Sequence, residues 1–187
     1  MFHRRTLLAS ALASSLPWPA WAQSSTGSSG KNSLTLGMAL EPPMLDPTVS
    51  AAAAIGEIVH YNLFETLTKI TPEGTVLPLL AQRWDVAPDL KTFTFHLRQD
   101  AQFHNGQPVT ADSVQFSFAR AASSTSTNKD KALFTQLKVT AKDRFTVVIE
   151  SAHSNPDLLF LLGQATAIIV EPQSAATNAT APGGTGP

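Results

Sequence analysis

The sequence predicts an α/β fold of the mixed α+β kind, in which strands pair antiparallel and helices lie between the pairs. Three observations predict it. Segments with alternating apolar residues are separated by short turn signals, helical patterns lie between them, and no regular strand–helix–strand repeat runs along the chain. Strands joined by tight turns pair antiparallel, because parallel strands need a long crossover connection.

The first expected elements are a strand over Leu34–Leu40, a helix over Ala51–Phe64 and a short strand over Leu67–Ile70. Two prolines end the first strand, because proline cannot donate a backbone hydrogen bond. Leu45–Pro47 predicts a turn, since the residue before a proline is disfavoured in the helical region. Ser50 is the expected N-cap of the helix. The buried face of that helix carries Ile55, Ile58, Val59 and Leu63.

A hairpin is predicted from Gln82–Val86 and Thr92–Leu97, which flank a short turn containing proline. In the second strand the apolar residues alternate with two threonines and a histidine, so the phenylalanines face a core. We interpret the aromatic series as core packing rather than as a ligand box. This series consists of Trp84, Phe93, Phe95 and Phe103.

The dipeptide Asn105–Gly106 predicts a tight turn, because both residues tolerate positive φ. Thr110 is the expected cap of a helix over Ala111–Ala121, and the Ser/Thr-rich stretch Ala122–Lys131 is expected to be a loop.

A second hairpin is predicted from Leu137–Thr140 and Phe145–Glu150, turning at Lys142 and Asp143. Three further segments follow: a helix that starts at Asn155–Asp157, a buried strand over Ala167–Val170, and an aperiodic tail over Gln173–Pro187.

Residues Met1–Ala22 have the pattern of a signal peptide, with a basic start, the apolar stretch Thr6–Leu16 and an A-x-A site at Ala20–Ala22. The apolar stretch is shorter than the roughly 20 residues that span a bilayer. The pair Arg4–Arg5 leaves general secretion and twin-arginine export both open. We expect Gln23–Ser33 to be a flexible Ser/Gly spacer and the mature protein to be periplasmic and soluble.

Cysteine is absent, so no thiol at the cleavage site can carry a lipid, and we expect the protein not to be a lipoprotein. Without the signal peptide, eleven Lys and Arg face fourteen Asp and Glu, a formal charge of −3. The chain has no basic cluster of the kind that a nucleic-acid partner requires, so no such partner is expected.

Neither a metal site nor a catalytic site is predicted. His96 and His104 have no partner at metal-ligand spacing, and no H-x-x-x-H occurs. Asp46 is explained by its turn, while Glu57 and Glu65 belong to no acid–base motif. No P-loop and no G-x-S-x-G is present, so we expect neither an enzyme nor a cofactor.

The run Ala51–Ala54 directly follows the predicted turn. Small side chains allow the backbone of a ligand to approach closely, as glycine does in other sites. The alternative is plain helix propensity, because alanine is the best helix former. The residues alone leave both interpretations open.

Five pieces, in a fixed order, resemble the N-terminal part of the family 5 extracellular solute-binding proteins, the peptide-type receptors of ABC importers. Together they cover about half of the chain, and Gly184–Pro187 also fits. One departure is Asp89–Lys91, where Asp-Gly-Lys is more usual, which leaves the turn type open. The five pieces are Leu45–Pro47, Leu77–Pro78 with Leu80–Ala81 and Trp84, Phe93–Arg98, Phe103–Gly106, and Thr110–Val114.

The resemblance implies the type II periplasmic-binding-protein architecture, in which two lobes close over a ligand by a hinge motion. Residues 34–187 would be the N-terminal part of this domain, with about Asp46–Gln164 as a subdomain inserted into the first lobe. The resemblance further implies backbone contacts to a bound peptide near the turn. The expected ligand-binding residues are Ser50, Ala51, Ala52 and Ala53.

The implied function is that of a monomeric substrate-binding component, which captures peptides or similar small solutes and delivers them to ABC permease subunits. Family members extend several hundred residues further, so we expect this chain to be a truncated fragment of a partial first lobe. The alternative is a periplasmic interaction or sensing module that derives from such a receptor and has lost transport.

Overall fold

The computed structural model describes residues 35, 37–177 and 186–187. The chain divides into two units, Met1–Gly37 and Met38–Pro187. The expected signal peptide and spacer lie outside the described residues. Thr35 and Gly37, the described residues of the first unit, belong to no helix or strand. Among the described residues, no helix is both long and apolar enough to cross a bilayer.

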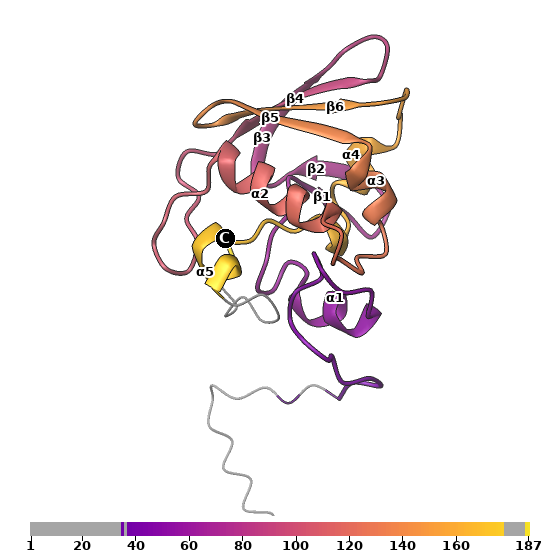
Figure 1. The fold of residues 1–187 in the computed structure, drawn as a ribbon, viewed down its shortest axis with the longest axis vertical. Coiled ribbons are helices and arrows are strands. Elements are labelled where there is room, and N and C mark those ends of the chain that lie inside the picture. Colours follow the sequence, from indigo (N-terminus) through magenta and orange to yellow (C-terminus); the bar gives the residue numbers. More distant parts are fainter. Residues whose placement is uncertain (1–34, 36, 178–185) are drawn as a thin grey trace, which may run out of the picture. The chain divides into compact units, whose positions relative to one another are not determined.

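The second unit is built around a four-stranded antiparallel sheet with the strand order β3-β4-β6-β5 (Figure 1). Two hairpins supply the strands, and β4 and β6 pair in the middle, with Phe95 opposite Val147. Both predicted hairpins are therefore confirmed. The strands are β3 (Ala81–Val86), β4 (Thr92–Leu97), β5 (Leu137–Asp143) and β6 (Thr146–Ser151).

The turns of the two hairpins differ from expectation in detail. Leu90 adopts φ 56°, the left-handed conformation that glycine usually takes, and its N–H donates to the carbonyl of Ala87 (2.9 Å). The hairpin thus forms without glycine. In the second hairpin β5 continues through a bulge as far as Asp143, so the turn lies at Arg144 and Phe145 rather than at the predicted position.

Helix α2 (Ala111–Ala122) packs on β5 and β6, and α3 (Lys131–Thr135) lies on the same side of the sheet (Figure 1). The predicted cap is confirmed: Thr110 precedes the first turn, and its N–H donates to Ser113 Oγ at 3.4 Å. Phe118 of α2 and Phe134 of α3 pack with ring centroids 5.1 Å apart. These side chains join the buried residues of β4 and β6 in the main core.

The remaining elements are short. Strand β1 (Thr68–Ile70) pairs with β2 (Val76–Pro78), a partner that the sequence pattern did not predict. The Asn105–Gly106 turn is confirmed, with Gly106 at φ 80° and its N–H bonded to the carbonyl of Phe103 (2.8 Å). The other short helices are α1 (Ala53–Val59), α4 (Leu158–Leu161), the 3-10 helix η1 (Ala165–Ala167) and α5 (Pro172–Thr177).

Helix α1 is much shorter than the predicted Ala51–Phe64, and Ala52 rather than Ser50 occupies its N-cap. Tyr61 explains the early end. It adopts φ 60°, and its hydroxyl accepts the N–H of Ile70 (3.0 Å) and donates to the carbonyl of Gly163 (2.9 Å). The left-handed backbone conformation of Tyr61 is incompatible with a continued right-handed helix, and the two hydrogen bonds hold its side chain in place.

Two other predictions are wrong. The described residues of Leu34–Leu40 form no strand, and none of the described strands pairs with them. The segment Ile168–Val170 is buried as expected, but it is not a strand either. The N–H of Ile169 donates to the carbonyl of Glu65 (2.9 Å), and this single hydrogen bond does not continue into a strand pairing. A strand requires a neighbour along its length, which neither segment has among the described strands.

A smaller second core positions α1. It also explains why the tail expected to be aperiodic contains α5, because Ala175 of that helix is buried in it. The carboxylate of Glu171 caps α5 by accepting the N–H groups of Gln173 (3.0 Å) and Ser174 (2.6 Å). The buried members of this core are Ile55, Val59, Phe64, Ile168, Val170 and Ala175.

We predict that Phe95→Ala lowers the free energy of unfolding by about 3–5 kcal/mol, because a fully buried phenylalanine is replaced by a cavity. Phe95 is 0% exposed in the centre of the sheet. Phe160→Ala is the matched control, since Phe160 is 38% exposed. Urea denaturation of residues 38–187 measures both. Equal midpoints for the two variants would contradict the core assignment.

Candidate ligand-binding site

The predicted turn at Leu45–Pro47 is held by a buried ion pair. Asp46 is 0% exposed, and its Oδ2 accepts Nε and Nη2 of Arg120 at 3.1 and 2.8 Å. Its Oδ1 accepts the N–H of Thr48 at 2.8 Å. The Arg120 side chain is 13% exposed and belongs to α2. Asp46 therefore links the turn to the main helix, which agrees with its interpretation as a structural carboxylate.

The Ser/Thr-rich loop after α2 binds the same turn from a second side. Asn128 Nδ2 donates to the carbonyl oxygens of Pro47 (3.0 Å) and Thr48 (3.3 Å). The N–H of Thr127 donates to the carbonyl of Val49 at 3.1 Å. This segment is a loop, as predicted, and it restrains the backbone that leads to the alanine run.

A cavity of about 350 Å³ opens directly beyond this turn. All four residues of the predicted site, Ser50–Ala53, line it. Ala51 and Ala52 precede α1, so helix propensity accounts only for the later alanines of the run. Ala51 and Ala53 are exposed, and neither has a side chain larger than a methyl group beside its main chain.

The opposite wall of the cavity comes from η1, through Ala165 and Thr166. Gly56 of α1 allows the two walls to approach each other, because a Cβ at this position would lie only 3.0 Å from the Cβ of Ala165. Most of the residues that line the cavity are thus small. Such a lining is suited to a ligand that has a peptide backbone.

Three larger polar side chains complete the lining: Glu57, His60 and Lys129. Lys129 Nζ lies 3.0 Å from Asp130 Oδ2. Burial lowers the pKa of His60, although a hydrogen bond to the carbonyl of Gly163 acts in the opposite direction. His60 Nε2 is buried without a hydrogen-bond partner among the described residues. The imidazole is therefore neutral at pH 7. The cavity thus combines an acidic side chain, Glu57, a basic side chain, Lys129, and the neutral ring of His60.

The other candidate residues lie elsewhere. His96 Nε2 is 3.1 Å from Asp85 Oδ2 at the surface of the sheet, and the N–H of His104 donates to the carbonyl of Gly186 (2.9 Å). Glu65 is half-buried; burial raises its pKa, and the charge of Arg98 lowers it. Among the described residues, no group of three or more His, Cys, Asp or Glu could hold a metal ion.

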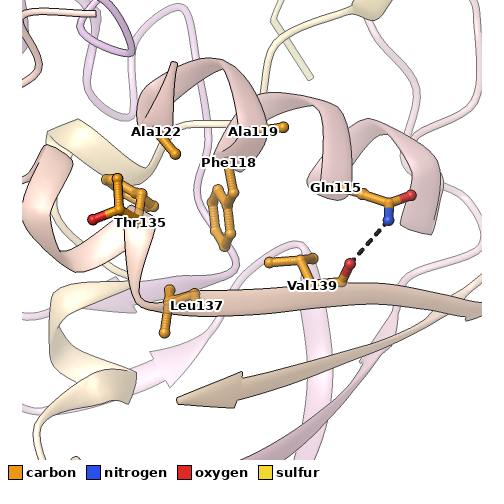
Figure 2. Close-up of a pocket in the computed structure, with 8 residues that line it drawn as sticks. Gln115, Phe118, Ala119, Ala122, Thr135, Leu137 and Val139 are labelled. Carbon is orange, nitrogen blue, oxygen red and sulfur yellow. Dashed lines mark hydrogen bonds between the residues drawn. The ribbon is translucent and has the colours of Figure 1, made fainter. Parts of the chain in front are cut away.

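A second pocket, of about 360 Å³, lies between α2, α3 and β5 (Figure 2). Its polar residues are Gln115 and Thr135, and Gln115 Nε2 already donates to the carbonyl of Val139 (2.9 Å), as Figure 2 shows. Phe118 fills the space between the helix and the strand. Because this pocket presents no charged side chain, the cavity at Ser50–Ala53 is the better candidate for a polar solute.

The sequence patterns did not reveal Asn128, Lys129 or Thr166 as parts of the site. The first two lie within a polar stretch that predicts only a loop, and Thr166 belongs to no motif. Asn128 joins segments that are far apart in the chain: it contacts Pro47, 81 residues away, and Thr166, 38 residues away. A buried asparagine in such a stretch has no local signature, so only the fold identifies it.

The sequence profile of the family described as "Bacterial extracellular solute-binding proteins, family 5 Middle" matches residues 75–187. The periplasmic oligopeptide-binding protein OppA of Haemophilus influenzae is 36% identical over 117 residues, which cover 61% of this chain and 21% of OppA. The probable D,D-dipeptide-binding periplasmic protein DdpA of Escherichia coli is 30% identical over 174 residues, which cover 90% of this chain and 32% of DdpA.

The solved structure of Haemophilus influenzae OppA in complex with RPPGFSPFR is similar to this fold, with a TM-score of 0.68 and 26% identity. The similarity covers 73% of this chain and 30% of that one. The predicted mixed α/β fold of a solute-binding protein is therefore confirmed over the matched part. The chain spans about a fifth to a third of the length of these relatives.

We predict that Asp46→Asn lowers the free energy of unfolding by about 3–5 kcal/mol, because it leaves the charge of Arg120 without its buried counter-ion. Glu150→Gln is the control. It removes one charge from an exposed pair with Lys138 (2.7 Å) and should cost less than about 1 kcal/mol. Chemical denaturation compares the two, and a smaller loss for the Asp46 variant would exclude a structural role for the buried pair.

The lowered pKa of His60 predicts a stability that depends on pH. The unfolded state takes up the proton more readily than the folded state. The contribution of His60 is therefore present above its unfolded pKa of about 6.5 and is lost as the pH falls towards the folded pKa. His60→Asn, which retains a side-chain N–H, should make the melting temperature less dependent on pH between 7.5 and 5. Thermal melts of both proteins test this, and parallel curves would contradict it.

Proposed function

The chain belongs to the bacterial extracellular solute-binding proteins of family 5, and on this premise we propose that its protein is the substrate-binding component of an ABC importer. It is exported to the periplasm by its signal peptide and acts there as a monomer. It captures peptides or similar small solutes and delivers them to permease subunits in the inner membrane. Relatives that are named as periplasmic peptide-binding proteins support this role.

The observation that carries the proposal is the cavity along Ser50–Ala53. A peptide presents the same N–H and C=O groups whatever its side chains are, so an accessible main chain is a partner that tolerates many sequences. Alanine side chains leave room for this approach, and Glu57 and Lys129 offer charges of both signs at the edge of the same cavity. The lining therefore suits a zwitterionic solute with a peptide backbone.

In this proposal residues 34–187 are the N-terminal part of the receptor, and the cavity is one wall of the binding site. A single backbone hydrogen bond in contact with water contributes only about 1 kcal/mol. Tight capture accordingly requires a second wall that excludes water, as closure of two lobes provides. We assign residues 46–164 to the inserted subdomain, which contributes the alanine segment to that site.

Filling the cavity tests the proposal. The complete product of the gene is titrated by calorimetry with an equimolar mixture of alanine peptides of two to five residues. Ala53→Trp should weaken binding at least tenfold, because the new side chain occupies the space next to the accessible backbone. Ala119→Trp is the matched control, since Ala119 is also an exposed helical alanine and lines the pocket in Figure 2.

Unchanged affinity in Ala119→Trp together with the loss in Ala53→Trp supports the site. Equal effects of the two substitutions would reject this location. Absence of peptide binding by the unmodified protein would reject peptides as its ligands.

A further inference from the structure

We propose that Asn128 is the positioning residue of the Ser50–Ala53 cavity, because its side-chain amide sets the separation of the two walls. Asn128 does not line the cavity, but it is 4% exposed directly behind it. The consequence for ligand affinity rests on the proposed function. The consequence for the geometry of the walls does not.

The amide joins both walls through one nitrogen. Asn128 Nδ2 donates to the carbonyl of Pro47 (3.0 Å) and to the carbonyl of Thr166 (3.1 Å). Pro47 lies in the wall that continues into the alanine segment, and Thr166 lies in the wall formed by η1. A change in either hydrogen bond therefore changes the width of the cavity.

The oxygen of the same amide places the charged edge of the cavity. Asn128 Oδ1 accepts the N–H of Asp130 at 2.8 Å. Asp130 Oδ2 then accepts Thr166 Oγ1 at 2.6 Å and pairs with Nζ of Lys129 at 3.0 Å. One asparagine side chain thus fixes three lining residues: Pro47, Lys129 and Thr166.

An amide is suited to this position because it has donors at one end and an acceptor at the other. A carboxylate of the same shape would face carbonyl oxygens without a proton to share, and an alanine would leave the carbonyls unpaired. A binding site requires its walls to be held within about 0.5 Å of the productive geometry. Loss of the donor should accordingly affect the cavity more than it affects the distant sheet.

The test compares Asn128→Asp with Thr127→Val. Thr127 lies in the same loop, and its Oγ1 donates to the carbonyl of Val49 (2.9 Å). Its side chain reaches one wall only, so Thr127→Val removes a single hydrogen bond without separating the walls. Both variants are made in the complete gene product. The first readout is hydrogen exchange of the backbone amides at Ala51–Ala53 and Thr166 without ligand, and the second is affinity for the alanine-peptide mixture.

At pH 7.5, Asn128→Asp should raise exchange at these amides and lower peptide affinity at least tenfold, whereas Thr127→Val should change neither by more than twofold. At pH 5 the affinity of Asn128→Asp should partly recover. The introduced carboxyl is buried among oxygens, so it takes up a proton readily and regains a donor. A role confined to overall stability would not produce this pH-dependent recovery at fixed temperature in the folded protein.

Equal exchange and affinity in the two variants would overturn the inference. If the unmodified protein binds no alanine peptide, the proposed ligand class fails, and the exchange measurement still decides whether Asn128 positions the walls. If Asn128→Asp does not fold, Asn128→Ala provides the same exchange comparison without a buried charge, and unchanged exchange there would refute the proposal.

Discussion

The buried carboxylate of Asp46 is the constraint on which the candidate site depends. It directly precedes Pro47, which lines the cavity, and it pairs with Arg120 of the helix that packs on the sheet. A buried charge is tolerated only when its partner and its hydrogen bonds are complete, so the turn has one permitted position relative to α2. The alanine segment begins a few residues later, and its place follows from that of the turn.

Two kinds of interaction hold different parts of this fold. The sheet and α2 enclose an apolar core, which supplies most of the stability. The segment beside the cavity is held mainly by directional bonds from Asp46 and Asn128 to backbone groups. Hydrogen bonds contribute little net energy each but permit few geometries, and this combination gives a surface loop the defined shape that binding requires.

The candidate site was predictable only in part. The resemblance to a family pointed to Ser50–Ala53, and the structure places these residues along one cavity. The prediction that Ser50 caps the helix was wrong, because α1 begins at Ala53 and Ala52 occupies its N-cap. Asn128 and Thr166 could not be recognised, since their function consists of contacts with segments far away in the chain.

The sequence by itself determined the two hairpins of the sheet, the Asn105–Gly106 turn and the start of α2 at Thr110. Each depends on residues within a few positions of one another, so its signal is local. Only the tertiary structure decided where α1 ends, and it left Ile168–Val170 buried without a strand partner among the described strands. It also brought the Asn128 side chain into hydrogen-bond contact with both walls of the cavity. These outcomes depend on hydrogen bonds and burial between segments that meet only after the chain has folded.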